Sequence, residues 1–298
     1  MELQQLRVFV MVAKHAHVSK AAAELHMAQP AVSRMIHELE RSCGGIPLVE
    51  KVGRHLRITE AGEALALHAQ SILAEVSAAE ATMRARQGLL AGRVSIGTPP
   101  SVGVRLLPPT LARFRQDFPD IELRIQQAGT NQLLHQLDNS EIDMAIATLP
   151  VPTKNHTIVP LFEESLVAVV SRTHRYALRG TIQMVDLADE AFLLYPPGYE
   201  MHDGIIAACK AAGFAPRVVI DGGDVALLLR LAAAGLGVAI VPQLALNGEE
   251  DLAIVHITTP TLSRSMALVY RSDRTLSAAG QMMVKAVLRT QNGDPKNT

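Results

Sequence analysis

A short run of polar side chains with helical spacing is the first feature whose chemistry can be named. Gln29, Ser33 and His37 recur at every fourth position, and Arg34 stands beside them. On a helix this spacing places amide, hydroxyl, imidazole and guanidinium groups on one face. These groups are the donors and acceptors that recognise base edges in the major groove of DNA. An ordinary solvated helix face is the alternative interpretation of the same pattern.

Pro30 indicates where this helix starts. Proline breaks a helix interior but fits the first turn, where its missing N–H would have no partner anyway. We therefore expect a helix over 29–41, a tight connection over 26–28, and a shorter helix over 19–25 that begins at Ser19. Four apolar residues at three- and four-residue spacing form the buried stripe of the longer helix: Val32, Met35, Ile36 and Leu39.

The flanking segments extend this pair of helices into a small domain. Residues 4–13 predict a preceding helix with Leu6, Phe9, Val10 and Ala13 on one face. The run of alanines over 21–23 is small enough to let two helices cross closely, as a helix-turn-helix requires.

A basic hairpin is expected after the third helix. In residues 46–63, IPLVEKVGRHLRITEAGE, two apolar pairs flank a turn that contains glycine and carries Lys51, Arg54, His55 and Arg57. Such a tip suits phosphates or a minor groove. Residues 1–58 are therefore predicted to form an all-α winged helix-turn-helix domain with a two-stranded wing.

Three stretches resemble the family of LysR-type transcriptional regulators: MELQQLRVFV, AAAELHMAQPAVSRMIHELE and LRITEAGE. Two departures appear, because Ala28 stands where the family usually has a capping Ser or Thr, and Leu48 and Val49 stand where it usually has Phe. The first exchange typically weakens a helix start by about 1 kcal/mol.

The resemblance implies a homodimer or homotetramer that binds double-stranded operator DNA and a small-molecule effector and contacts RNA polymerase. It further implies activation of a neighbouring operon and repression of the regulator's own transcription. The residues expected to face DNA are Ser19, Gln29, Pro30, Ser33, Arg34, His37, Lys51 and Arg54.

Composition is compatible with these expectations. The chain has 298 residues, of which 48% are hydrophobic and 19% charged, so it is long enough for two or three compact units. A formal net charge of −1 argues against non-specific coating of nucleic acid, but a specific reader needs only a local basic patch. A leader-type N-terminus and a long apolar run are missing, so we expect a cytoplasmic protein with no membrane span.

The cysteines and histidines predict no metal site or other cofactor. Cys43 and Cys209 lie far apart in the sequence, and no CxxC or Cys/His cluster occurs. A buried, unreactive Cys209 is favoured over a redox sensor, because no resolving partner is evident.

Residues 59–89 predict a linker helix that forms a dimer. Two seven-residue series, one with Leu65 and Ile72 and the other with Val76 and Met83, make a coiled-coil seam. These side chains have no evident partner within the chain, so a second copy is expected to cover them. A long helix packed on its own domain is the alternative.

The remainder, 92–298, alternates strand and helix patterns. Strands are expected at RVSIG, IELRIQQ, DMAIAT, SLVAVVS, AFLLYP, RVVID, GVAIVP, LAIVHI and MALVYR. Helices are expected at 102–117, 130–138, 199–213 and 223–234. This is an α/β pattern with mostly parallel sheets. The resemblance implies two Rossmann-like subdomains as in periplasmic binding proteins, about 92–161 with 267–298 and about 162–266, with crossovers near 162 and 266.

An effector cleft is expected beyond the carboxyl ends of the strands, where helices start. Hydroxyls at helix starts favour a small organic anion, such as a carboxylate or sulfonate, although each hydroxyl alone also suits a plain N-cap. The opposite wall is expected to be apolar and aromatic. The predicted effector-binding residues are Thr98, Pro100, Ser101, Thr130, Thr148, Pro197, Tyr199 and Met201.

Two other classes of function fit the sequence less well. A hydrolase using Ser101 lacks a GxSxG elbow and a nameable His and Asp, and no P-loop or HExxH occurs, so no catalytic residue is predicted. A small-molecule binding protein without regulatory role would account for 92–298 but not for the winged helix. A regulator is therefore the preferred hypothesis, and not an enzyme.

Overall fold

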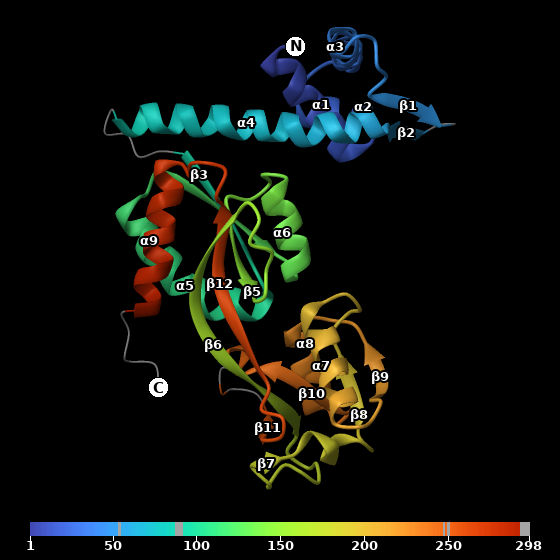
Figure 1. The fold of residues 1–298 in the computed structure, drawn as a ribbon, viewed down its shortest axis with the longest axis vertical. Helices are drawn as coiled ribbons and strands as arrows, with labels where there is room; N and C mark the ends of the chain where they lie inside the picture. Colours follow the sequence, from blue (N-terminus) through green and yellow to red (C-terminus); the bar gives the residue numbers. More distant parts are fainter. Residues whose placement is uncertain (53–54, 87–91, 247, 249–250, 293–298) are drawn as a thin grey trace. The chain divides into compact units, whose positions relative to one another are not determined.

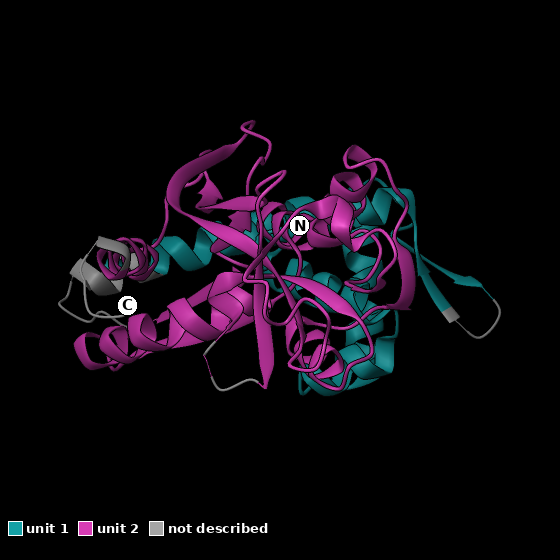
Figure 2. Cartoon of the chain, turned by 90° about the horizontal axis from the view of Figure 1, so that it is seen from below, with its two compact units in different colours: residues 1–89, 139–141 teal, residues 90–138, 142–298 magenta. Residues whose placement is uncertain are grey.

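The computed structural model describes residues 1–52, 55–86, 92–246, 248 and 251–292. These fall into two compact units, one of residues 1–89 with 139–141 and the other of residues 90–138 with 142–298 (Figure 2). Each unit has its own hydrophobic core.

The described residues of the first unit form three short helices, a hairpin and one long helix (Figure 1). The elements are α1 (Leu3–His15), α2 (Val18–Glu24), α3 (Gln29–Ser42), β1 (Val49–Val52), β2 (His55–Ile58) and α4 (Glu60–Arg86). Pro30 occupies the first turn of α3, as predicted, and the N-cap residue Ala28 makes no side-chain cap hydrogen bond. The hairpin is antiparallel, with Val49 opposite Ile58.

The core of the first unit forms where α1, α2 and α3 cross. Phe9, Val32 and Leu39 are completely buried, and so is Ala21, whose small side chain permits the close crossing. The beginning of α4 also packs here through Ala69, with Leu65 half-buried beside it. The expectation that Leu65 has no partner within the chain is therefore wrong, because this turn of α4 covers the core of its own unit.

The second unit is an α/β structure built on one branched sheet. Its strands are β3 (Gly92–Thr98), β4 (Ile121–Gln127), β5 (Met144–Thr148), β6 (His156–Ser171), β7 (Thr181–Ile182), β8 (Ala191–Leu194), β9 (Arg217–Asp221), β10 (Val238–Pro242), β11 (Leu252–Ile257) and β12 (Ser263–Arg271). Its helices are α5 (Pro100–Asp117), α6 (Thr130–Asp138), α7 (Glu200–Ala211), α8 (Val225–Ala233) and α9 (Ala278–Asn292), with 3-10 turns η1 (Met184–Leu187) and η2 (Gln243–Ala245).

Parallel strands form the two ends of this sheet, which we call lobe I and lobe II. In lobe I, β3 pairs in parallel with β4 and β5. In lobe II, β8 pairs in parallel with β9 and β10. The strand order β4-β3-β5-β12-β6-β10-β8-β9 connects the lobes through β12 and β6. Helices α5 and α9 pack on each other in lobe I, whereas α7 and α8 belong to lobe II (Figure 1).

The two connecting strands are longer than the sequence pattern predicted. Strands were expected at SLVAVVS and MALVYR, but β6 and β12 begin earlier, pass through the positions near 162 and 266 where crossovers were expected, and run antiparallel side by side (Figure 1). Pro160 stands at a register irregularity between Met266 and Ala267, where its missing N–H is tolerated. The sheet is therefore parallel within the lobes and antiparallel between them, not mostly parallel throughout.

The lobes bury separate apolar clusters. Phe114, Ile96 and Met283 lie in the cluster between α5, β3 and α9, which explains why the C-terminal helix, not predicted from the sequence, is part of lobe I. Phe192, Leu228 and Val241 lie in the cluster of lobe II. No helix in the described part of the chain is both long and apolar enough to span a bilayer.

Candidate DNA-binding face and ligand pocket

The exposed side of α3 carries the polar residues that were predicted to read DNA. Gln29, Arg34 and His37 are exposed and Ser33 is half-buried. The hydroxyl of Ser19 on α2 donates to Oε1 of Gln29 at 3.0 Å, so α2 orients the Gln29 amide. Within the described chain, Arg34 makes no hydrogen bond or ion pair.

His37 is engaged by a neighbour on its own helix. Its Nδ1 lies 3.1 Å from Oε2 of Glu40, although the ring is 75% exposed. The other oxygen of Glu40 accepts the backbone N–H of Leu48 at 2.9 Å, which ties α3 to the segment that enters the wing. His37 is thus less available to a base than Gln29 or Arg34.

The wing presents fewer unpaired cations than its sequence suggests. Lys51 is exposed, while Arg57 is paired with Glu50, whose Oε1 lies 2.5 Å from Nη2. Arg54, predicted to hold the backbone, lies outside the described residues. Phosphate contacts by Lys51 and Arg54 therefore stay a prediction.

The predicted dimerisation residues differ in exposure along α4. Ile72 and Met83 are 41% and 55% exposed, large values for apolar side chains, whereas Val76 is half-buried. Leu65 packs on the core of its own unit, as described above. Ile72 and Met83 are consequently better placed than Leu65 to meet a second copy.

A pocket of about 210 Å³ opens between the two lobes of the second unit. It lies beyond the carboxyl ends of β3, β4, β8 and β10, and helices α5, α7 and α8 begin at its wall. The lining residues are Pro100, Ser101, Gln127, Ala128, Tyr195, Pro196, Tyr199, Met201, Gly223, Asp224, Val225, Pro242 and Arg264.

A buried ion pair forms the centre of the pocket's polar lining. Arg264 on β12 lies directly opposite Glu164 on β6, and the two side chains are each only 4% exposed. Arg264 Nε and Nη2 lie 2.8 Å and 2.6 Å from Glu164 Oε1. The second Glu164 oxygen accepts the N–H of Leu244 from lobe II at 3.1 Å. This pair therefore holds both connecting strands and η2 together.

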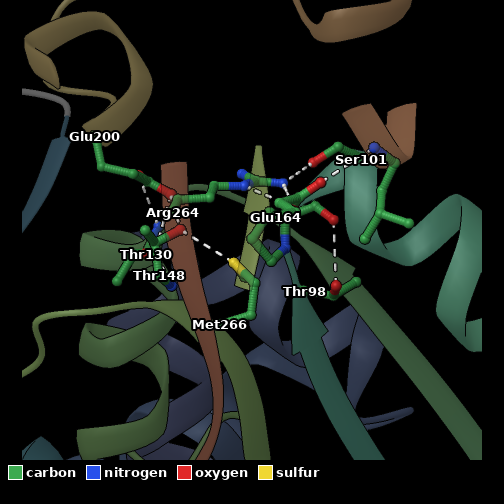
Figure 3. A network of polar contacts seen from close by, with 10 residues as sticks. Thr98, Ser101, Thr130, Thr148, Glu164, Glu200, Arg264 and Met266 are labelled. Atoms are coloured by element: carbon green, nitrogen blue, oxygen red, sulfur yellow. Dashed lines mark hydrogen bonds and ion pairs between the residues drawn. The ribbon is translucent and has the colours of Figure 1, made fainter. Parts of the chain in front are cut away.

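Ser101 completes this network from the first turn of α5. Arg264 Nη2 donates to its hydroxyl at 2.7 Å, so the guanidinium lies between Ser101 and Glu164 (Figure 3). Among described residues, Nη1 of Arg264 has no hydrogen-bond partner. A guanidinium cannot accept a proton from Ser101, so this hydroxyl is not activated as a nucleophile and the hydrolase alternative has no support.

Two stacked tyrosines form the lobe II side of the pocket. The rings of Tyr195 and Tyr199 are 5.7 Å apart at an angle of 8°. Burial raises the pKa of both hydroxyls above the ordinary value, so both remain protonated donors at neutral pH. Tyr195 is 4% exposed, and its hydroxyl has no hydrogen-bond partner among the described residues. A buried hydroxyl without a partner is costly unless a ligand or water meets it.

A second polar network lies where α7 meets α6. The Glu200 carboxylate accepts the N–H of Thr130 at 3.1 Å and its hydroxyl at 2.9 Å (Figure 3). Thr148 adds a longer contact to Glu200 at 3.4 Å, and its N–H donates to the Thr130 hydroxyl at 3.0 Å. Gly129 makes the approach possible, since a methyl group there would lie 2.9 Å from the Tyr199 ring.

Half of the predicted effector residues line the pocket. Pro100, Ser101, Tyr199 and Met201 do so. The others do not, for identifiable reasons. Thr98 is fully buried and donates to the carbonyl of Pro99, Thr130 and Thr148 are engaged with Glu200, and Pro197 is exposed outside the lining.

Sequence reasoning missed Arg264 and Glu164. A signal for both was present, because each is a charged residue next to an apolar strand segment, which is unusual unless the charge is paired. Their pairing across a sequence separation of 100 residues was not visible.

The described residues contain no group of three side chains suited to a metal ion. The two cysteines are free thiols in different units, Cys43 half-buried and Cys209 fully buried. Burial raises the pKa of Cys209 to about 11.

A helix-turn-helix joined to an α/β unit with a pocket between two lobes defines the class of ligand-responsive DNA-binding regulators. Comparison with known protein families identifies which family of such regulators this chain belongs to. Residues 3–63 match the bacterial regulatory helix-turn-helix protein model of the lysR family, and residues 87–291 match the LysR substrate binding domain. The chain belongs to the LysR family of transcriptional regulators and is not an enzyme.

Similar proteins cover nearly the whole chain. The transcriptional dual regulator GltC of Bacillus subtilis is 32% identical over 293 residues, 97% of each chain. A hydrogen peroxide-inducible genes activator of Escherichia coli O6:H1 is 31% identical over 297 residues, 98% of this chain and 97% of the other. Full-length CbnR in complex with its target DNA superposes with a TM-score of 0.70 at 25% identity, covering 97% of this chain and 100% of that one. Like its family, the chain binds DNA.

Proposed function

We propose that this regulator responds to a small organic anion bound between the lobes of the second unit, with Arg264 as its principal anchor. The observation that carries the proposal is the Arg264 guanidinium at the pocket wall, positioned by Glu164 and Ser101 but with Nη1 unused by described residues. Guanidinium groups bind carboxylates through paired, charge-assisted hydrogen bonds. The start of α5 and the unpaired Tyr195 hydroxyl supply further donors beside it.

The position of Arg264 explains how ligand binding would affect the protein outside the pocket. Arg264 and Glu164 lie on the strands that connect the lobes, Ser101 lies in lobe I, and the Leu244 N–H lies in lobe II. A ligand that bonds to this group favours one arrangement of the lobes over others. We propose that this change is transmitted to the winged helices and alters how they bind and bend operator DNA.

On the DNA, we propose that Gln29, Ser33 and Arg34 read bases, with Ser19 orienting Gln29, and that Lys51 and Arg54 hold the backbone. Two copies pair through α4, as a homodimer or within a homotetramer, and the exposed Ile72 and Met83 support this assembly. Activation of a neighbouring operon through RNA polymerase, with repression of its own transcription, agrees with the name of the relative described as a dual regulator.

Peroxide sensing is the alternative that the second relative's name raises, and thiols are the side chains through which a protein would sense peroxide. The thiols of this chain do not favour it. Reactivity with peroxide requires a thiolate, whereas Cys209 is fully buried with its pKa raised to about 11, and Cys43 belongs to the other unit. A reversible ligand is therefore the better proposal.

A calorimetric titration tests the anion site. The effector is first identified by mass spectrometry of small molecules that co-purify with the protein. The Ser101 hydroxyl accepts from Arg264, so its own proton can be donated to the ligand carboxylate. Ser101→Ala removes that donor, so ligand affinity is expected to fall by roughly tenfold to a hundredfold, the value of one bond to a charged group. DNA binding without ligand should not change. Wild-type ligand affinity in both Ser101→Ala and Arg264→Lys would place the ligand elsewhere.

A further inference from the structure

We propose that the ligand of this pocket is a zwitterion, a small carboxylic acid that also carries a protonated amine. The proposal rests on the proposed function, since it assigns the carboxylate to the corner formed by Arg264 and the start of α5. It is carried by the uneven distribution of charge around the pocket, which has one positive corner and a negative remainder.

The positive corner lies at the start of α5. This helix has no acidic residue in its first turn and no side-chain cap, and its first residues, Pro100 and Ser101, line the pocket. The N-terminal end of a helix carries partial positive charge, which attracts anions. Arg264 adds a full charge with Nη1 unpaired among the described residues, and it lies beside the hydroxyl of Ser101.

The start of α8, by contrast, carries a carboxylate of its own. Asp224 is the N-cap residue, and its Oδ1 accepts the N–H of Leu227 at 2.9 Å. Asp224 also lines the pocket, and its Oδ2 has no hydrogen-bond partner among the described residues. This oxygen is suited to a protonated amine of the ligand.

The start of α6 is occupied in the same way by Glu200. Its carboxylate accepts both the N–H and the hydroxyl of Thr130, which are the donors that a second ligand carboxylate would need. The residues on both sides of Glu200, Tyr199 and Met201, line the pocket. A second carboxylate on the ligand would therefore find the Thr130 donors already bonded to Glu200.

The charges around the pocket consequently favour one anion and one cation on the ligand. Arg264 pairs with Glu164 through Nε and Nη2 but keeps Nη1 for a ligand anion, whereas no cation among the described residues forms an ion pair with Glu200 or Asp224. Burial raises the pKa of the Tyr199 hydroxyl, Glu200 and Asp224 raise it further and Arg264 lowers it, so all three charges influence this pocket-lining side chain. A dicarboxylate placed here would experience repulsion that an amino acid would not.

Two matched series of probes test this inference by calorimetric titration of the full-length protein. One series is benzoate, para-(aminomethyl)benzoate and terephthalate, and the other is valerate, δ-aminovalerate and glutarate. Each series holds the carbon skeleton nearly constant while the far end changes from neutral to cationic to anionic. In at least one series we expect the zwitterion to bind about tenfold more tightly than the monoanion, the value of one charged hydrogen bond at a partly exposed site. The dianion should bind most weakly.

Asp224→Asn provides the specific variant, because asparagine caps a helix about as well as aspartate and only the charge is lost. In this variant we expect the zwitterion to bind only as tightly as the monoanion, and the affinity for the monoanion to equal that of the wild type. Asp120→Asn is the matched control, since Asp120 is exposed and does not line the pocket. Glu200→Ala should raise the affinity of the dianion alone.

The outcomes separate this inference from the proposed function. Suppose that the monoanion binds and that Arg264→Lys lowers its affinity. If the amine then gives no increase in affinity, or if Asp224→Asn leaves that increase intact, the zwitterion proposal is refuted and the anion site stands. If binding of every probe is unaffected by Arg264→Lys, the anion site itself is refuted. If no probe binds at millimolar concentration, both are refuted.

Discussion

The buried pair of Arg264 and Glu164 allows a quantitative test of how the lobes are joined. Each side chain is 4% exposed, and the closest nitrogen and oxygen are 2.6 Å apart. Removing one partner leaves a buried charge without compensation, which typically costs about 3 to 5 kcal/mol. We therefore expect Arg264→Met and Glu164→Leu each to lower the free energy of unfolding of the second unit by about this amount.

The double variant is the informative one. With both charges removed, the apolar replacements fill a buried site without a stranded ion, so the loss should be smaller than in either single variant. The remaining cost comes from the Leu244 N–H and the Ser101 hydroxyl, which lose their partners.

Tyrosine fluorescence during urea unfolding measures this without interference from the first unit. The chain has no tryptophan, and its four tyrosines, at 176, 195, 199 and 270, all lie in the second unit. Losses below about 1 kcal/mol in both single variants would show that the pair is not isolated from water. A double variant whose loss equals the sum of the two single losses would show that the charges do not interact.

The other predictions concern the first unit. Arg34→Ala should cost about 1 to 3 kcal/mol of discrimination between operator and random DNA, whereas Lys51→Ala should weaken both alike, as measured by fluorescence anisotropy. Equal losses on both DNAs for Arg34→Ala would contradict base recognition. Ile72→Glu should give monomers in light scattering with the fold retained, because its side chain is 41% exposed. Leu65→Glu should instead destabilise the first unit, and an unchanged mass for Ile72→Glu would contradict pairing through α4.

Local signals were sufficient where one element decides its own boundaries. Pro30 and the apolar stripe of α3 predicted the start of that helix, and the strand IELRIQQ corresponds to β4 over its full length. The predicted helix over 130–138 is α6. These features depend on backbone stereochemistry and on side-chain periodicity, which adjacent residues determine.

Features that depend on distant partners were not predictable in the same way. Strand β6 was expected to begin near Ser165, because Pro160 and the two glutamates before Ser165 interrupt the apolar pattern. Pairing with β12 compensates for these interruptions, and this pairing is a property of the folded sheet. The same holds for the pocket. The ends of the predicted strands were sufficient to predict Ser101 and Tyr199, but not Arg264.

Thr130 shows why a correct local pattern can still mislead. Its position at a helix start suggested a donor for a ligand anion, but in the structure its N–H and hydroxyl are satisfied by Glu200 from the other lobe. The sequence contains both residues, 70 positions apart, without any local sign that they meet.

The central claim is that occupation of the Arg264 pocket changes how the winged helices hold DNA. Footprinting of the DNA upstream of the protein's own reading frame, with and without the co-purified ligand, tests it most directly. The account predicts protection by wild-type protein whose extent changes on adding ligand, while Arg264→Lys gives the same ligand-free footprint but no change. An identical ligand-induced change in Arg264→Lys would contradict the claim.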